Sequence, residues 1–225
     1  MNALMDTFRV LFDPVAVFER QREKSSVLMP FLVIAVVQIV LGVLNLPYIQ
    51  VALKAQMAAR GAAAPAGGPD PSSFAWIGIV FAPIGIFIFL LVATLIVWVL
   101  VSIFGGEGKF AMLLSVTTHA AVPSVILMAI IGAVVLRMRG PDTITSFMDL
   151  QPALGLDLLA PGTTGFMGAV LKGINPFAIW GLVIQAIGIS VTHKLPRSTG
   201  YTVATISFVI GLAVGAALSG MGGPR

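Results

Sequence analysis

Long runs of apolar residues, separated by short polar stretches, dominate the sequence. Five of these runs cover residues 27–46, 74–104, 111–136, 170–191 and 201–219. A helix needs about 20 mostly apolar residues to cross the hydrocarbon core of a bilayer. Apart from Lys172 near the start of the fourth run, none of them contains Asp, Glu, Lys or Arg. The pattern predicts an all-α polytopic membrane protein, a bundle of five transmembrane helices in contact with the lipid bilayer.

The second run is too long for a straight helix that crosses the membrane at right angles. Its 31 residues would measure about 46 Å at about 1.5 Å per residue, against about 30 Å of hydrocarbon. We expect this helix to tilt, kink or protrude. Pro83 is the expected position of a kink, because proline removes a backbone donor and crowds the preceding turn.

Residues 1–26 precede the first run and are rich in charge. A cleavable signal peptide needs an uninterrupted apolar stretch of about 7–15 residues, so we expect this segment to be retained. Its apolar residues recur at roughly helical spacing, and Asp13-Pro14 is typical of a helix start. It is either an amphipathic helical segment on the cytoplasmic membrane surface or a helix packed beneath its own bundle. Phe8, Phe12 and Phe18 form its candidate interaction surface.

The loops between the runs differ in character. Residues 61–71 are rich in Ala, Gly and Pro, which is typical of a segment without regular structure. Residues 137–169 mix three aspartates with many apolar side chains, a combination that suits a segment lying at the membrane interface. Residues 105–109 read Gly-Gly-Glu-Gly-Lys, which we interpret as a tight turn, because no strand precedes it and no Lys-Ser/Thr pair follows.

Composition and charge exclude several classes of protein. Of 225 residues, 58% are hydrophobic and only 10% are charged, whereas soluble proteins carry roughly 25% charge. The net charge of +4 includes no basic stripe, so we expect no nucleic-acid partner. There is no cysteine, and the two histidines lie far apart in the sequence. We therefore expect no disulfide, no metal and no other cofactor.

The placement of Lys and Arg predicts the orientation in the membrane. If all five runs cross the membrane, seven of the 13 Lys and Arg residues lie on the side of the N-terminus and six lie on the other side. The cluster before the first run and the density in the short loops favour a cytoplasmic N-terminus. Five crossings then place the short C-terminal tail, residues 220–225, outside.

His119 is the one ionisable side chain clearly inside a predicted span, and such residues are candidates for function. Pro123 follows four residues later and leaves the His119 carbonyl without its usual helical donor. A polar site in the membrane could use this combination. The alternative is a histidine that only hydrogen-bonds to a neighbouring helix.

Three amide side chains also lie in the predicted spans: Gln38, Asn45 and Gln185. Gln38 and Asn45 are seven residues apart and share a helix face. In lipid, such amides usually hydrogen-bond across helix contacts, each worth roughly 1 kcal/mol. Structural contacts of this kind are the favoured interpretation, and a transport pathway is the alternative.

The last run carries small residues four apart, at Gly211, Gly215 and Ser219. Small residues at this spacing allow two helices to approach closely. We expect a contact inside the bundle, and a homo-oligomer is the alternative.

Several segments together resemble the Yip-one domain family of integral membrane proteins, the Ypt/Rab-interacting proteins and their bacterial relatives. They are residues 12–20 (Phe-Asp-Pro-Val-Ala-Val-Phe-Glu-Arg), residues 104–110 with Leu114-Ser-Val and Pro123 downstream, and residues 174–180 (Ile-Asn-Pro-Phe-Ala-Ile-Trp). The resemblance extends from about Phe8 to about Gly211. It implies five transmembrane helices, a cytoplasmic N-terminus and no enzymatic activity. The loops and short tails look bacterial, so the vesicle-traffic role of the eukaryotic relatives is not transferred.

Two hypotheses of function follow. The first is a non-enzymatic scaffold or accessory protein of the bacterial cytoplasmic (inner) membrane, which binds other membrane proteins or shapes membrane organisation. The second is a small transporter, channel or lipid-handling protein with a polar site near His119 and Pro123. An enzyme is not expected, because the sequence contains no paired carboxylates and no catalytic motif.

Overall fold

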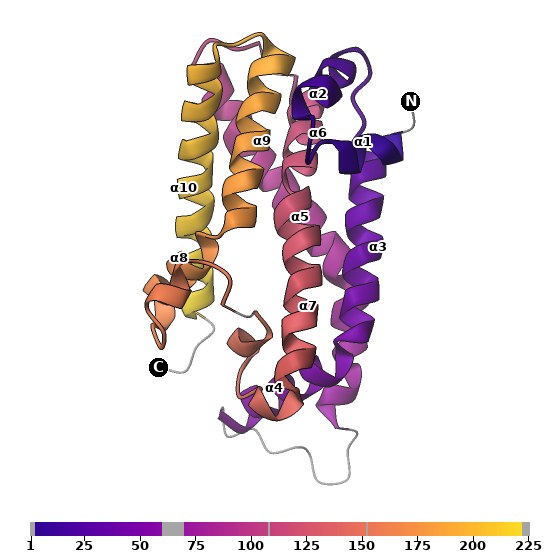
Figure 1. The fold of residues 1–225 in the computed structure, drawn as a ribbon, viewed down its shortest axis with the longest axis vertical. Coiled ribbons are helices and arrows are strands. Elements are labelled where there is room, and N and C mark those ends of the chain that lie inside the picture. Colours follow the sequence, from indigo (N-terminus) through magenta and orange to yellow (C-terminus); the bar gives the residue numbers. More distant parts are fainter. Residues whose placement is uncertain (1–2, 60–69, 108, 152, 222–225) are drawn as a thin grey trace.

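The protein is described here from a computed structural model, which covers residues 3–59, 70–107, 109–151 and 153–221. Four stretches are long and apolar enough to cross a membrane: Ser72–Ile103, Phe110–Arg139, Pro176–His193 and Arg197–Leu218. A fifth candidate is the bent pair of α3 (Leu28–Leu44) and α4 (Leu46–Ala59). The helices stand side by side as one bundle (Figure 1). The predicted all-α polytopic membrane fold is confirmed.

The first span is short and ends in a sharp bend. The axis of α4 turns by 70° from that of α3. The Asn45 N–H still donates to the Leu41 carbonyl at 2.8 Å, but Pro47 has no N–H with which to continue the ladder. As a result α4 lies across one end of the bundle, away from α1 and α2 (Figure 1).

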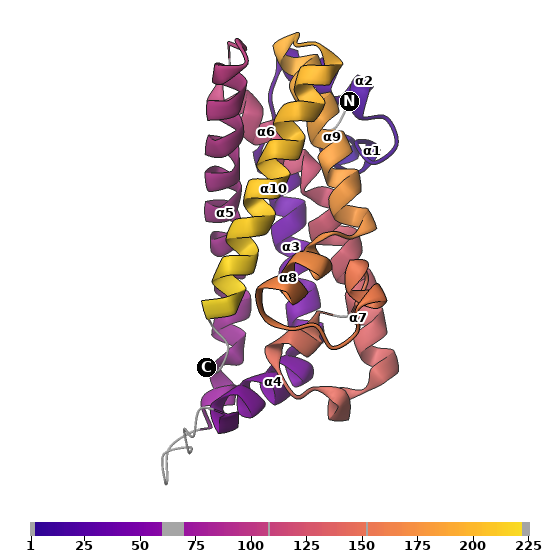
Figure 2. The same cartoon turned by 90° about the vertical axis from the view of Figure 1, so that its left-hand side faces the viewer.

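The second span, α5 (Ala75–Ile103), is one helix of 29 residues that continues through Pro83. Pro83 is buried and removes its own backbone donor, but it does not interrupt the helix. At about 1.5 Å per residue α5 is about 43 Å long, more than the hydrocarbon requires. It runs along most of the height of the bundle (Figure 2).

The third span is divided by a π turn. It consists of α6 (Phe110–Ala120), the π turn η2 (Pro123–Leu127) and α7 (Met128–Arg139). Pro123 cannot donate to His119, and the helix widens so that the Met128 N–H donates to the Pro123 carbonyl five residues back. The half before the turn, α6, packs against α2, α3, α5 and α9, and the half after it, α7, also packs against α3.

The fourth span is α9 (Pro176–His193), which begins six residues after the predicted start at residue 170. The Asn175 side chain caps it by accepting from the Ala178 N–H at 2.9 Å. Lys172 belongs instead to the separate short helix α8 (Gly165–Gly173). The last span, α10 (Arg197–Met221), returns beside α9 and ends at the opposite end of the bundle from α1 and α2 (Figure 1).

The loop between α7 and α8 forms three short 3-10 turns: η3 (Pro141–Thr143), η4 (Phe147–Leu150) and η5 (Leu156–Leu159). Burial raises the pKa of Asp149, but hydrogen bonds from the Thr145 and Ser146 N–H and hydroxyl groups outweigh it and lower that pKa. Asp149 therefore stabilises the turn before η4 as a carboxylate. A small hydrophobic core of Ala52, Leu136 and Ile144 joins this loop to α4 and α7.

The N-terminal segment packs into the end of the bundle. It forms α1 (Ala3–Arg9) and α2 (Pro14–Glu23), with Asp13 as the N-cap of α2. An ion pair between Arg20 and Asp6 joins the two helices, at 2.5 Å. Val10, Val17 and Phe18 are part of the main hydrophobic core together with residues of α3, α5, α6, α9 and α10. Of the two interpretations, the structure therefore favours packing against the bundle.

Candidate functional site

His119 lies on α6 and is fully buried. Its Nδ1 donates to the Ser115 carbonyl at 2.8 Å, one turn back on the same helix. A neutral imidazole with its proton on Nδ1 keeps a lone pair on Nε2. This Nε2 has no hydrogen-bond partner among the described residues.

The ring of Phe18 covers His119 from the side of α2. The two ring centroids are 6.0 Å apart and the planes are inclined at 76°, an edge-to-face arrangement. Gly188 on α9 makes room for Phe18: a Cβ there would lie 2.9 Å from two ring carbons of Phe18 and 2.6 Å from Val116. The glycine is therefore required for α2 to dock between α6 and α9.

A second polar contact ties α2 to α6 beside this ring pair. Gln21 is buried, and its Oε1 accepts from the Ser26 N–H at 2.6 Å. The Ser115 hydroxyl lies 3.1 Å from Gln21 Oε1 and 3.0 Å from the Ser26 carbonyl. The polar groups next to His119 are thus committed to holding the N-terminal segment in place.

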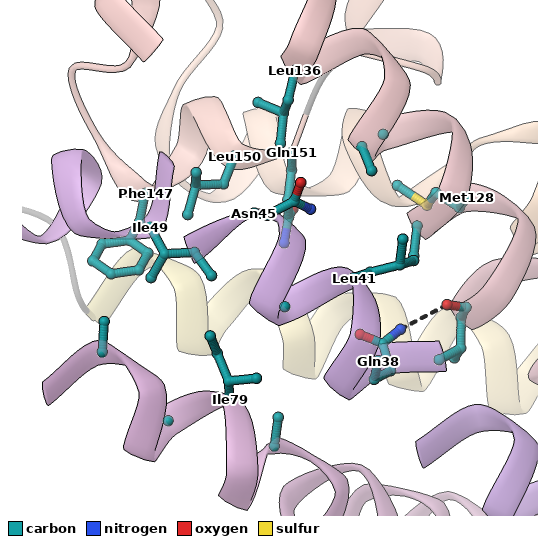
Figure 3. Close-up of a pocket in the computed structure, with 18 of the residues that line it drawn as sticks. Gln38, Leu41, Asn45, Ile49, Ile79, Met128, Leu136, Phe147, Leu150 and Gln151 are labelled. Carbon is teal, nitrogen blue, oxygen red and sulfur yellow. Dashed lines mark hydrogen bonds between the residues drawn. The ribbon is translucent and has the colours of Figure 1, made fainter. Parts of the chain in front are cut away.

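The π turn presents a backbone carbonyl to a neighbouring helix. Gln38 on α3 donates from Nε2 to the Val125 carbonyl at 2.7 Å (Figure 3, dashed line). Pro123 begins this turn, and the carbonyl that bonds to α3 belongs to Val125, two residues later, and not to His119. The amide of Gln38 acts as a contact between helices, as expected for amides in lipid.

A cavity of about 780 Å³ extends from this contact toward the end of the bundle that carries α4. Its walls come from α3, α4, α5, the π turn, α7 and the loop around η4 (Figure 3). Most of the lining is apolar, for example Leu41, Ile79 and Met128. Gln38 lies at the inner end, and Asn45 lines the wall nearer to α4.

The predicted polar site is not assembled as a unit. Gln38 and Asn45 line the cavity, whereas His119 and Gln185 do not. His119 is enclosed by α2 and α6, on the other side of the π turn. Gln185, on α9, is half-buried. The cavity therefore begins at the π turn, at Ser124 and Val125, and does not include His119.

Arg137 holds a residue of the cavity wall, Asn45, in place, a contact that the sequence did not predict. Its guanidinium donates to Asn45 Oδ1 at 3.0 Å, to the Leu44 carbonyl at 3.1 Å and to the Ala133 carbonyl at 2.9 Å. A cation at the C-terminal carbonyls of α3 is favourable for the helix dipole. The available signal was an arginine directly after an apolar run, but its partner 92 residues earlier could not be inferred.

Gly211 and Gly215 on α10 make no close contact inside the bundle. A Cβ added at Gly211 or Gly215 would meet no heavy atom within 4 Å. The expected internal contact is therefore wrong at these two positions, because α10 turns this face outward. The side chain of Ser219 lies outside the described residues.

The three phenylalanines of the candidate interaction surface separate into two groups. Phe18 is 0% exposed and belongs to the core, so it is unavailable to a partner. Phe12 is 87% exposed and Phe8 is 43% exposed. The reason is the break between α1 and α2: Phe8 is on α1, Phe12 lies in the turn, and Phe18 faces inward from α2.

Comparisons with known proteins identify the family. The model of the Yip1 domain matches residues 8–218, almost the whole chain. The chain belongs to the Yip1 domain family. The resemblance seen in the sequence is thereby confirmed, and with the apolar spans it makes this chain an integral membrane protein.

A bacterial membrane protein is similar to this chain over almost its whole length. Membrane protein YknW of Bacillus subtilis (strain 168) is 29% identical over 219 residues, which is 95% of this chain and 89% of that protein. No solved structure matches the chain. Contact with the lipid bilayer agrees with the surface of this Yip1 domain, because α5 and α10 carry exposed apolar residues such as Phe89 and Val214.

Proposed function

We propose that this protein is a non-enzymatic scaffold or accessory protein of the bacterial cytoplasmic membrane. It binds another membrane protein through an edge formed by α1 and the turn before α2. One observation carries the proposal: this edge, which lies outside the spans, exposes four large apolar side chains. They are Leu4, Met5, Phe8 and Phe12. Exposed apolar groups of this kind mark contact sites with proteins or membranes.

The edge is anchored to the bundle, which favours recognition. Phe18 anchors α2 in the core, and the ion pair between Arg20 and Asp6 fixes α1 against α2. Arg9 and Asp13 form a second, exposed ion pair at 2.9 Å on either side of Phe12 in the sequence. An aromatic anchor bordered by charged groups is typical of protein–protein interfaces.

The absence of enzymatic activity is supported by how the polar groups in the bundle are used. Gln38 and the imidazole Nδ1 of His119 are bonded to backbone carbonyls, and Ser115 is bonded to the N-terminal segment. Among the described residues no group of three or more His, Asp or Glu side chains comes together. These side chains hold helices together, and they do not converge on one reacting position.

We place the N-terminal edge in the cytoplasm and the end of α10 outside. Arg9, Arg20, Arg22 and Lys24 lie in or next to α1 and α2. Lys109, in the turn before α6, and Lys194, in the turn before α10, belong to the same end of the bundle (Figure 1). Short segments rich in Lys and Arg remain on the cytoplasmic side.

Site-specific photo-crosslinking tests the proposed edge. A benzophenone amino acid replaces Phe12 in the full chain at native expression level, and Phe104 in a matched control. Phe104 is also an exposed phenylalanine at this end of the bundle, at the C-cap of α5. We expect a discrete adduct with one membrane protein from position 12 and none from position 104.

The partner is then verified in the reverse direction. Purification of that protein in mild detergent should recover this chain, and Phe12→Ala should reduce the recovery without loss of this chain from the membrane. Labelling of lipid alone from position 12, with the chain purifying by itself, would contradict the proposal.

A further inference from the structure

We propose that the cavity between α3, α5 and α7 binds one acyl chain of a bilayer phospholipid. This site is separate from the N-terminal edge and does not depend on the scaffold function. The occupant follows from four features of the cavity: the small residues in its walls, its depth, its polarity and its opening.

Small residues on two helices create the space. On α5 they are Ala75, Gly78 and Ala82, which share one face, and α7 contributes Gly132 and Ala133. Faces of this kind normally bring membrane helices into contact. Here a Cβ added at Gly78 would meet no heavy atom within 4 Å. The small residues on α5 therefore leave a gap where a close helix contact is expected.

The neighbouring residue on α5, Ile79, is in tight contact with α3. A Cβ added at Gly42 would lie 2.7 Å from the side chain of Ile79, so α3 and α5 are in tight contact there. Gly42 and Ile79 both line the cavity. One wall is thus fixed by close packing while the space beside it stays open, which argues that the gap is a defined feature of the fold.

The depth of the cavity matches one lipid tail. Along the third span its lining runs from Ser124 to Leu136, which is about 18 Å at about 1.5 Å per residue. Each leaflet supplies half of the hydrocarbon core, about 15 Å. The volume of about 780 Å³ also lies within the range of about 300–1,000 Å³ for ligand sites.

The middle of the cavity is lined by apolar residues, whereas the end near α4 has Asn45 and Gln151 in its wall, as suits the chain and headgroup of a phospholipid. Gln38 at the inner end is polar, but its amide Nε2 is already bonded to the Val125 carbonyl. Two cations are bonded to the polar residues near α4: Arg137 to Asn45 Oδ1, and Lys172 Nζ to the Gln151 carbonyl at 3.1 Å. A chain in the cavity would place its glycerol and headgroup among these polar groups.

The cavity is also open to lipid. Gly78 and Ala82 line it and are at the same time exposed within the span Ser72–Ile103. A tail can therefore enter sideways from the leaflet without passing a layer of protein. An unfilled apolar space would deprive its lining of dispersion contacts, and the surrounding acyl chains are the groups available to restore them.

Photoreactive lipids test the site in vesicles. The full chain is reconstituted in phosphatidylethanolamine and phosphatidylglycerol with a trace of phosphatidylethanolamine that carries a diazirine at the end of one chain, or next to the glycerol. We expect the chain-end probe to label residues 38–41 and 125–128, and the glycerol-proximal probe to label residues 147–151. The order of labelling along the cavity is specific to a bound chain.

Two glycine substitutions on α5 provide a matched pair. Gly78 and Gly85 lie seven residues apart, are both exposed, and both have no heavy atom within 4 Å of an added Cβ. Only Gly78 lines the cavity. Gly78→Leu should reduce labelling of the cavity residues to the level of Val214 on the lipid-facing side of α10, whereas Gly85→Leu should leave it unchanged.

The outcomes separate the possibilities. Labelling spread evenly over α5 and α10, or cavity labelling that persists in Gly78→Leu, would overturn the proposal. A co-purified polypeptide found crosslinked to the cavity residues would also overturn the proposal. Ala129→Leu, on the facing wall of α7, replaces Gly78→Leu if that variant does not fold. Phe12→Ala should leave lipid labelling intact, so the result is independent of the proposed scaffold function.

Discussion

Replacing Phe18 by alanine tests how the N-terminal segment is attached to the bundle. Phe18 is 0% exposed and its ring lies between His119 on α6 and Gly188 on α9. Because α2 is outside the spans, the substitution should release α1 and α2 while the membrane helices stay inserted. The expected effect is therefore local undocking of the segment.

The magnitude follows from the buried ring. Burial of an aromatic side chain removes about 150–250 Å² from water, which corresponds to roughly 4–6 kcal/mol at about 25 cal/mol per Å². Measured Phe→Ala substitutions in cores cost about 3–5 kcal/mol. The released segment can rest on the membrane surface and recover part of this burial, so we expect about 3 kcal/mol. That is about a hundredfold rise in the undocked population, since 1.4 kcal/mol is tenfold.

Hydrogen exchange measured by mass spectrometry provides the assay. In the reconstituted protein, the amides of residues 14–23 should exchange about a hundredfold faster in Phe18→Ala, in line with the undocked population, because exchange reports local opening. Phe12→Ala is the control: this ring is 87% exposed, so exchange in α2 should not change. Equal protection of α2 in Phe18→Ala and in the unsubstituted protein would refute the attachment described here.

Two further substitutions test contacts inside the bundle. Arg137→Gln removes hydrogen bonds to the C-terminal end of α3 and should lower stability by about 1–3 kcal/mol in thermal unfolding in detergent, whereas Arg139→Gln should have little effect. Gly181→Ala places a Cβ 2.7 Å from the Ala120 carbonyl oxygen, a backbone atom that cannot move aside, and should destabilise the contact between α9 and α6. Gly215→Ala, with open space around it, should be neutral or slightly stabilising by the same measurement, because alanine favours a helix more than glycine does. Equal losses in both glycine variants would refute the packing explanation.

The spans were predictable because hydropathy depends on composition over many residues. A run such as 74–104 has no alternative to the membrane, whatever its neighbours are. Breaks within the runs were harder to predict. Pro83 and Pro123 carry the same local signal, yet α5 continues through the first, whereas the second begins a π turn. The difference arises from contacts with other helices, which a single sequence does not report.

The candidate site was less predictable, because it depends on which way each helix faces. Phe8, Phe12 and Phe18 were grouped as one candidate interaction surface because apolar residues recur at roughly helical spacing in this segment. The break at Asp13-Pro14 changes the register, so the ring of Phe12 is exposed and that of Phe18 is buried. Gln38 and Asn45 were correctly placed on one face, but the cavity that they line requires α5 and α7 at the right distance, which is a tertiary property.

The π turn has a consequence for how the two halves of the third span are oriented. Each residue of an α-helix rotates the side chains by about 100°, and a π turn accommodates one residue more than an α turn does. Everything after Pro123 is therefore out of phase with α6 by about this angle. Without the turn, Gly132 and Ala133 would point in a different direction and the cavity would lose a wall. The open space beside α5 therefore depends on the rotation that the π turn introduces between α6 and α7. A one-residue deletion between Pro123 and Leu127 would remove this rotation and turn Gly132 and Ala133 away from the cavity.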